Sequence, residues 1–140
     1  MAFATWLPVE AGTDVWDLVP DAAVALRALY ASLWDAGVDP AVLDACRARV
    51  EAVVAGLPRS DPEDGGAAVR AAVAFAEQYA LDPHGVTDAD AAALHDLFTP
   101  GELAALTTAL ATFDALARVR VVLSSPAGTR ASIAIATDTV

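Results

Sequence analysis

Apolar residues recur along this chain at the spacing of helices rather than in the alternation of strands. In the first regular stretch they follow the i, i+3, i+4, i+7, i+8 pattern of a single helix face: Leu26, Leu29, Tyr30, Leu33 and Trp34. This spacing predicts a helix over residues 20–36. Gly37 follows where a left-handed cap would end that helix, because glycine adopts a positive φ at little cost.

The second regular stretch carries helix signals at both of its ends. Asp39 followed by Pro40 fits an N-cap with proline in the first helical position, and Gly56 fits a C-terminal cap. The apolar positions between them share one helix face: Leu43, Cys46, Val50, Val53 and Val54. Residues 57–66, LPRSDPEDGG, hold two prolines and two glycines and therefore predict a flexible connection.

A third helix is expected over residues 67–80, where four apolar positions would face inward: Val69, Val73, Ala76 and Tyr79. The Asp-Pro-His-Gly segment at residues 82–85 predicts a turn after it. Thr87 and Asp90 then form a weaker version of the capping box, opening a short helix with three inward positions: Leu94, Leu97 and Phe98.

The last regular stretch opens with a full capping box. Thr99 and Glu102 have the required spacing, and Pro100 occupies the first helical position. A long inward stripe follows on one face: Leu103, Leu106, Leu110, Phe113 and Ala117. The chain is therefore predicted to be an all-α, single-domain bundle of about five to six helices.

The two ends of the chain lack this regular spacing. Residues 1–19 hold Trp6 and Trp16 among proline, glycine and acidic residues, which favours an N-terminal arm, extended over the helical body and anchored by its aromatic side chains. The helical domain covers residues 20–123. In the C-terminal tail, residues 124–140, the alternation of Ile133 and Ile135 fits a short strand, a packed arm or a disordered end.

Composition narrows the classes of function. The 140 residues are enough for one domain, and a net charge of −11 disfavours nucleic acid and anionic membrane surfaces as partners. Charged residues interrupt every apolar run before the ~20 residues that a spanning helix needs. Because residues 1–10 show neither a basic nor an apolar signal region, we expect a cytoplasmic protein. One cysteine and two histidines cannot form a structural zinc cluster, so neither a metal nor a cofactor is expected.

Two stretches together carry a family resemblance. Residues 71–123 contain a helix that ends in an acidic-Pro-His turn, a helix after VTD, and a long capped helix. Their sequence is AAVAFAEQYALDPHGVTDADAAALHDLFTPGELAALTTALATFDALARVRVVL. Two predicted helices precede this stretch, in residues 26–56, LRALYASLWDAGVDPAVLDACRARVEAVVAG. Residues 20–123 thereby resemble the carboxymuconolactone decarboxylase and alkylhydroperoxidase-D-like family. The resemblance implies an alkylhydroperoxidase-D-like fold and a homo-oligomer, which would be a dimer, a trimer or a hexamer.

The same resemblance implies that the family's redox site is missing. Peroxidases of this family use a CxxC pair followed by a histidine, because a dithiol must attack peroxide and then close to a disulfide. The resemblance puts Gly56 and Arg59 at the two cysteine positions and Glu63 at the histidine. None of these residues can do thiol chemistry. The family's upstream glutamate falls on Asp44, which keeps its charge.

Each candidate residue has a structural and a functional interpretation. Cys46 lies on the apolar face of its helix. It is either a buried, inert thiol or a lone peroxidatic nucleophile. His84 is either a solvated turn residue or a proton carrier, and His95 either complements a helix dipole or serves as a base. Asp44 and Arg47 have the spacing of a helical ion pair.

Arginines could instead belong to a ligand site. Asp44 and Arg49 are candidates to border the remnant of the family's active site, together with Arg59, where an arginine could bind a carboxylate ligand. Arg118 and Arg120 fit either solvent or a subunit contact.

Three functions follow from these alternatives. The first is an oligomeric protein without peroxidase activity that binds a small molecule or a partner protein. The second is a non-redox acid–base enzyme, similar to the family's lactone decarboxylases or to an isomerase, with Asp44 and one histidine as its groups. The third is a one-cysteine peroxidase in which Cys46 reacts and an external thiol resolves the product.

Overall fold

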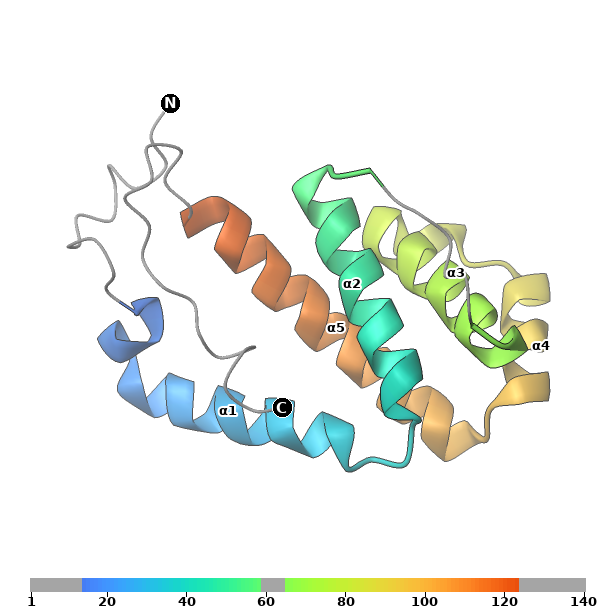
Figure 1. Ribbon diagram of the computed structural model, residues 1–140, viewed down its shortest axis with the longest axis horizontal. Helices are drawn as coiled ribbons and strands as arrows, with labels where there is room; N and C mark the ends of the chain where they lie inside the picture. Colours follow the sequence, from blue (N-terminus) through green and yellow to red (C-terminus); the bar gives the residue numbers. More distant parts are fainter. Residues whose placement is uncertain (1–13, 59–64, 124–140) are drawn as a thin grey trace.

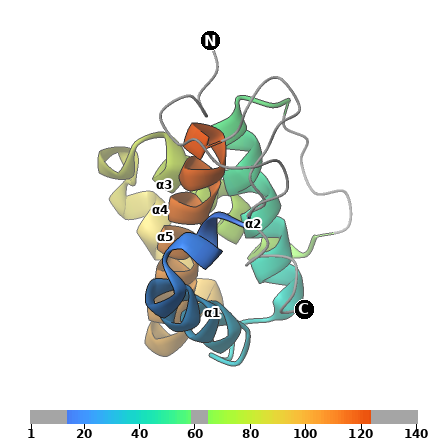
Figure 2. The ribbon, with the colours of Figure 1, turned by 90° about the vertical axis from the view of Figure 1, so that its left-hand side faces the viewer.

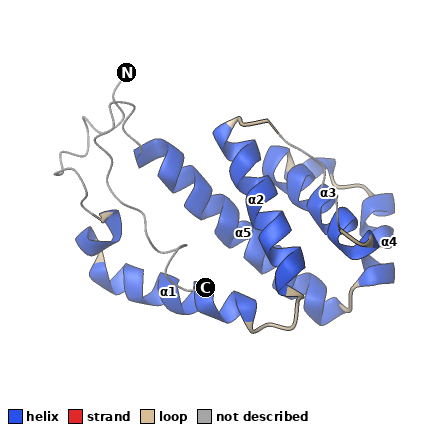
Figure 3. Ribbon diagram, viewed as in Figure 1, coloured by secondary structure: helices blue, strands red, loops and turns tan. Residues whose placement is uncertain are grey.

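The computed structural model describes residues 14–58 and 65–123, and within these ranges the chain is all-helical (Figures 1 and 3). Five α-helices and two short 3₁₀ helices occur there, in this order: η2 (Val15–Leu18), α1 (Pro20–Trp34), α2 (Pro40–Ala55), α3 (Ala67–Leu81), η3 (Pro83–Gly85), α4 (Asp88–Leu97) and α5 (Pro100–Leu123). The predicted all-α class is confirmed. None of these helices combines the length and apolarity needed to cross a membrane.

The ends of α2 lie where the sequence predicts them. The Asp39 carboxylate accepts a hydrogen bond from the backbone N–H of Ala41 at 2.9 Å, and Pro40 is the first residue of the helix. At the other end Gly56 adopts φ 68°, the left-handed conformation that satisfies the last carbonyl groups. Local side-chain chemistry therefore fixes both ends of this helix.

Two capping boxes define the corner between α4 and α5. The Thr87 hydroxyl accepts from the Asp90 N–H at 3.2 Å, while the Asp90 carboxylate accepts from the Thr87 N–H at 3.0 Å. The bond from the Thr87 N–H lowers the pKa of the Asp90 carboxyl group, and so does a second bond, which the Thr87 hydroxyl donates to the same carboxylate at 2.8 Å. Thr99 and Glu102 repeat the arrangement at the start of α5, with both bonds at 3.2 Å. Both predicted boxes are confirmed.

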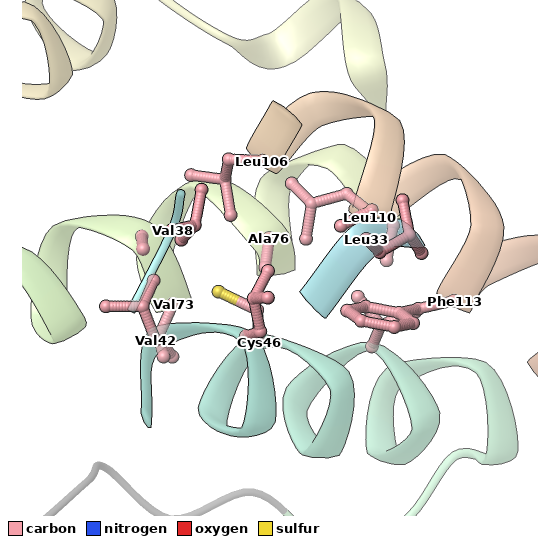
Figure 4. Packing of buried hydrophobic residues seen from close by; sticks show 14 of the residues in the cluster. Leu33, Val38, Val42, Cys46, Val73, Ala76, Leu106, Leu110 and Phe113 are labelled. Atoms are coloured by element: carbon pink, nitrogen blue, oxygen red, sulfur yellow. The ribbon is translucent and has the colours of Figure 1, made fainter. Parts of the chain in front are cut away.

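The core lies around α2, which packs against α3 on one side and against α5 on another. Figure 4 shows this packing around the middle of α2. Four residues of α2 are almost completely buried: Val42, Leu43, Cys46 and Val50. An aromatic cluster joins α1 to α5, in which the ring centroids of Tyr30, Trp34 and Phe113 lie 6.1–6.2 Å apart. The bundle is therefore organised by two long central helices, α2 and α5.

Some sequence expectations differ from the structure. Residues 15–18 form a 3₁₀ turn rather than part of an extended arm, because Asp14 caps it, and Trp16 packs partly buried against the core. Helix α1 ends at Trp34, two residues before the predicted end. Leu29 and Leu97 lie on the predicted apolar faces but are 41% and 40% exposed. Trp6 and the tail, residues 124–140, lie outside the described residues.

Candidate functional site: an apolar pocket between α1 and α5

Asp44 and Arg49 lie on α2 but have different neighbours. Five helical residues correspond to a rotation of about 140° around the axis. The Asp44 side chain is 52% exposed and accepts from Arg47 at 3.0 Å, which confirms the predicted helical pair. The Arg49 side chain is 8% exposed and donates to Glu77 of α3 at 2.7 Å. Arg49 thus joins α2 to α3, and Arg59 lies outside the described residues.

Arg47 makes contacts that the sequence spacing did not indicate. Besides Asp44, its guanidinium donates to the Tyr30 hydroxyl at 2.7 Å and lies over the Trp34 ring, 5.5 Å from the centroid. Planar stacking and multiple donors are typical of arginine at such junctions. The cluster therefore fastens the C-terminal half of α1 to α2.

Cys46 is enclosed by the core. Its side chain is 0% exposed, and Figure 4 shows its sulfur among the labelled residues Val42, Val73, Ala76 and Leu106. Burial raises the pKa of the thiol to about 12. Because the thiolate is the reactive nucleophile, a thiol that stays protonated and covered has neither the charge state nor the access that peroxide attack requires.

The two histidines lie at the surface. The His84 side chain is 96% exposed in η3, and its Nδ1 is 3.5 Å from an Asp82 carboxylate oxygen. His95 is exposed in the last turn of α4. Within residues 14–58 and 65–123, no hydrogen bond or ion pair joins either histidine to Asp44.

Arg118 and Arg120 both have partners within the chain. Arg118 donates to Asp114 at 2.9 Å and to the Ala80 carbonyl at 3.1 Å, so it ties the end of α3 to α5. The hydrogen bond and charge of Asp114 raise the pKa of this guanidinium further. Arg120 donates to Glu51 of α2 at 3.0 Å.

The described residues contain an apolar pocket that sequence reasoning did not identify. It lies between η2, α1 and α5 and has a volume of about 390 Å³. We call it the η2–α1–α5 pocket. Its lining residues are Trp16, Leu26, Leu29, Thr108, Ala111, Thr112, Ala115, Leu116 and Val119. None of these side chains is ionisable, so the lining itself supplies no acid or base group.

The pocket follows from how α1 meets α5. Near the end of α1, Tyr30 and Leu33 are buried, and the Tyr30 ring packs edge-on against Phe113 of α5. Toward the start of α1 the two helices diverge (Figure 1). There α5 presents the small residues Ala111 and Ala115, which do not fill the space between the helices.

Trp16 closes one side of the pocket, and its place is set by Asp14. One Asp14 carboxylate oxygen accepts from the Trp16 backbone N–H at 3.0 Å, and the other lies 3.9 Å from Arg27 of α1. In Figure 2, η2 leads directly into the first turn of α1. The indole Nε1 of Trp16 is buried and has no hydrogen-bond partner among residues 14–58 and 65–123.

No family model, no curated protein and no solved structure matches the chain.

A second hollow, of about 320 Å³, lies between α2 and α5. We call it the α2–α5 hollow, and its lining residues are Ala48, Glu51, Ala52, Ala55, Leu57, Ala117, Arg120 and Val121. Unlike the η2–α1–α5 pocket it contains an ion pair, Arg120 with Glu51. Among the described residues no group of three histidine, cysteine or acidic side chains is placed to hold a metal ion.

Proposed function

We propose that this chain is a small-molecule-binding protein related to the carboxymuconolactone decarboxylase and alkylhydroperoxidase-D-like proteins, without their thiol chemistry. The observation that carries the proposal is the η2–α1–α5 pocket. Its volume of about 390 Å³ lies in the range typical of ligand sites, and such sites are mostly apolar with a few placed polar groups. Trp16, Thr108 and Thr112 are the polar side chains in this lining.

The surroundings of the reactive residues support binding over catalysis. A buried thiol with a pKa of about 12 does not supply the nucleophile of a one-cysteine peroxidase. An acid–base enzyme would need a histidine at Asp44, and the contacts of Asp44 and His84 run instead to Arg47 and Asp82. The η2–α1–α5 pocket contains neither the thiol nor these groups.

Titration with N-phenyl-1-naphthylamine tests the proposal. This uncharged probe fluoresces strongly when it leaves water for an apolar site, so we expect a saturable rise with one site per chain. Ala115→Phe places a ring in the pocket and should abolish the saturable signal, as should Ala111→Phe one turn earlier on the same face.

Ala55→Phe is the matched control, because Ala55 is also an exposed helical alanine but lines the α2–α5 hollow. It should leave the titration unchanged. If the wild type gives no saturable signal, or if Ala55→Phe and Ala115→Phe weaken binding equally, this pocket is not the binding site.

We also propose that the chain forms a homo-oligomer, as the resemblance implies. Exposed apolar residues support this: Leu57 and Val121 line the α2–α5 hollow and are 59% and 38% exposed, and Val122, next in the chain, is 48% exposed. Light scattering should show an assembly that Val121→Asp dissociates. Leu97→Asp, which changes another exposed apolar residue, should leave it intact. A wild type that stays monomeric at high concentration contradicts this part of the proposal.

A further inference from the structure

We infer that the ligand of the η2–α1–α5 pocket is a free, uncharged amphiphile, such as a fatty alcohol, whose linear alkyl chain lies along α5 while its polar group stays in water. The inference rests on the proposed function, because it names the class of ligand for the same pocket. Three features of the pocket lead to it: its extent along α5, the lack of available polar groups in its wall, and the absence of charge.

The pocket extends along α5 for about three helical turns. On this helix its lining runs from Thr108 to Val119 and includes four residues between them: Ala111, Thr112, Ala115 and Leu116. At about 1.5 Å per residue, the interval from residue 108 to residue 119 measures roughly 16 Å. Each carbon of an extended alkyl chain advances about 1.25 Å, as C–C bonds of about 1.5 Å at a tetrahedral angle give. A chain of about twelve carbons therefore matches the length of this wall.

The polar side chains of the lining are not available to a ligand as donors. The Thr108 hydroxyl donates to the Ala104 carbonyl at 2.8 Å, and the Thr112 hydroxyl donates to the Thr108 carbonyl at 2.9 Å. Each hydroxyl has one hydrogen, so both hydrogens are already used, and the indole Nε1 of Trp16 is buried. An oxygen atom of a ligand would lose its bonds to water here without gaining one from these side chains. The part of the ligand that enters the pocket is therefore hydrocarbon.

The polar end of such a ligand has a route to water, because the pocket is open along one side. Four of its lining residues are exposed: Leu29, Thr108, Ala111 and Ala115. An alkyl chain that covers this apolar surface gains affinity with every carbon. Each methylene that leaves water should strengthen binding about three- to fourfold.

Charge decides against a fatty acid. Among the described residues that line the pocket none is ionisable, so a carboxylate would find no counter-ion in the lining. The net charge of −11 adds a long-range repulsion of anions. Arg27 of α1 lies outside the lining, and its guanidinium faces the Asp14 carboxylate at 3.9 Å. An uncharged end group avoids the repulsion.

A series of 1-alkanols from hexanol to tetradecanol tests the inference on the full chain. Dissociation constants are measured by displacement of N-phenyl-1-naphthylamine, and the rise in melting temperature gives a second readout that needs no dye. We expect the constant to fall about three- to fourfold per methylene up to about twelve carbons, and then to level off because further carbons lie beyond the lining. An affinity that is independent of chain length, or that still rises from dodecanol to tetradecanol, would overturn the inference.

Val119→Phe places a ring at one end of the lining on α5. It should leave the binding of hexanol unchanged and weaken that of dodecanol at least about tenfold, because the last turn of the wall is blocked. Val24→Phe is the matched control, since Val24 of α1 is 68% exposed and does not line the pocket. It should leave the whole series unchanged. An equal loss for short and long alkanols in Val119→Phe would show that the chain does not lie along α5.

Two comparisons test the charge and the source of the chain. Dodecanoate should bind more weakly than dodecanol at low salt, and added salt should narrow the difference by screening the repulsion. Tighter binding of dodecanoate would refute the expected absence of charge. Phosphatidylcholine vesicles should leave the protein in the supernatant on sedimentation, whereas co-sedimentation would show that the pocket takes chains from a membrane rather than a free amphiphile.

The outcomes separate the inference from the proposed function. If the dye binds saturably and no alkanol displaces it, the pocket binds ligands and the class of ligand inferred here is wrong. If the dye gives no saturable signal and no alkanol raises the melting temperature, the proposed function fails and the inference with it.

Discussion

Raising the pH should destabilise this protein through one residue, Cys46. Its side chain is 0% exposed, and desolvation raises the pKa of its thiol from 9.0 to about 12. Below pH 9 the thiol is protonated in both the folded and the unfolded chain, so its full contribution to stability is present. Above pH 9 the unfolded chain ionises while the folded chain does not, and stability is lost until about pH 12.

The size of the effect follows from linkage. Each pH unit between the two pKa values lowers the free energy of unfolding by about 1.4 kcal/mol for this single group. From pH 9 to pH 11 the loss approaches about 2–3 kcal/mol, a large part of the 5–15 kcal/mol typical of a domain. No thiol at the surface would produce a loss of this sign and size.

Guanidine denaturation of the wild type and of Cys46→Ala, at intervals from pH 8 to pH 11, isolates the thiol. Other titrating groups are common to both proteins and cancel in the difference. The wild type should be more stable at pH 8, because Cys46→Ala leaves a cavity, and that advantage should shrink by about 1.4 kcal/mol per unit above pH 9. Parallel stability curves for the two proteins would refute the reasoning.

Three further predictions concern chemistry, the ion pair and the helix ends. Neither the wild type nor Cys46→Ser should consume hydrogen peroxide or an organic hydroperoxide with a thiol reductant; turnover that disappears in the variant would make Cys46 peroxidatic. Arg49→Met should lower the free energy of unfolding, measured by urea denaturation, by about 3 kcal/mol, because Glu77 loses this partner. The double variant Arg49→Met/Glu77→Met should recover part of this loss. Equal losses in the single and the double variant would contradict the reasoning. In thermal melts, Gly56→Ala should lower the free energy of unfolding by about 1–2 kcal/mol, because Gly56 has φ 68°, which an alanine adopts only with strain. The cause is the backbone alone, since nothing lies within 4 Å of the added Cβ. In the same thermal melts Gly101→Ala, which lies within α5, should be neutral or stabilising. A stabilising Gly56→Ala would show that this left-handed cap is not required.

Most of the helix boundaries could be predicted from the sequence because they depend on nearby residues. The Thr99–Glu102 box closes within one turn, and the Asp39 cap reaches only Ala41, so the residues that form each signal are adjacent in the chain. The apolar face of α2 was predictable for the same reason, since one period of 3.6 residues describes it. The specific alkylhydroperoxidase-D-like arrangement stays a prediction.

Contacts between distant helices could not be predicted in this way. Arg49 and Glu77 are separated by 28 positions, and nothing in either local pattern indicates that α2 and α3 bring them together. The same applies to the η2–α1–α5 pocket. Its existence depends on the divergence of α1 from α5, and the spacing of Leu26 and Leu29 alone predicts a packed face. Trp16 was predicted as an anchor, but not as a wall of a pocket.

The way in which α1 is attached has a consequence for how the fold opens. Its C-terminal half is held by buried Tyr30, whereas only Ala23 is buried among residues 20–26, and Val24 is 68% exposed. The Asp14–Arg27 pair that links η2 to α1 is partly exposed and contributes at most about 1 kcal/mol. We therefore expect amide hydrogens in η2 and the first turns of α1 to exchange through a local opening that costs less free energy than global unfolding. That opening would move one wall of the pocket while α2, α3 and α5 stay folded, so a bound compound could enter and leave a protein that remains native.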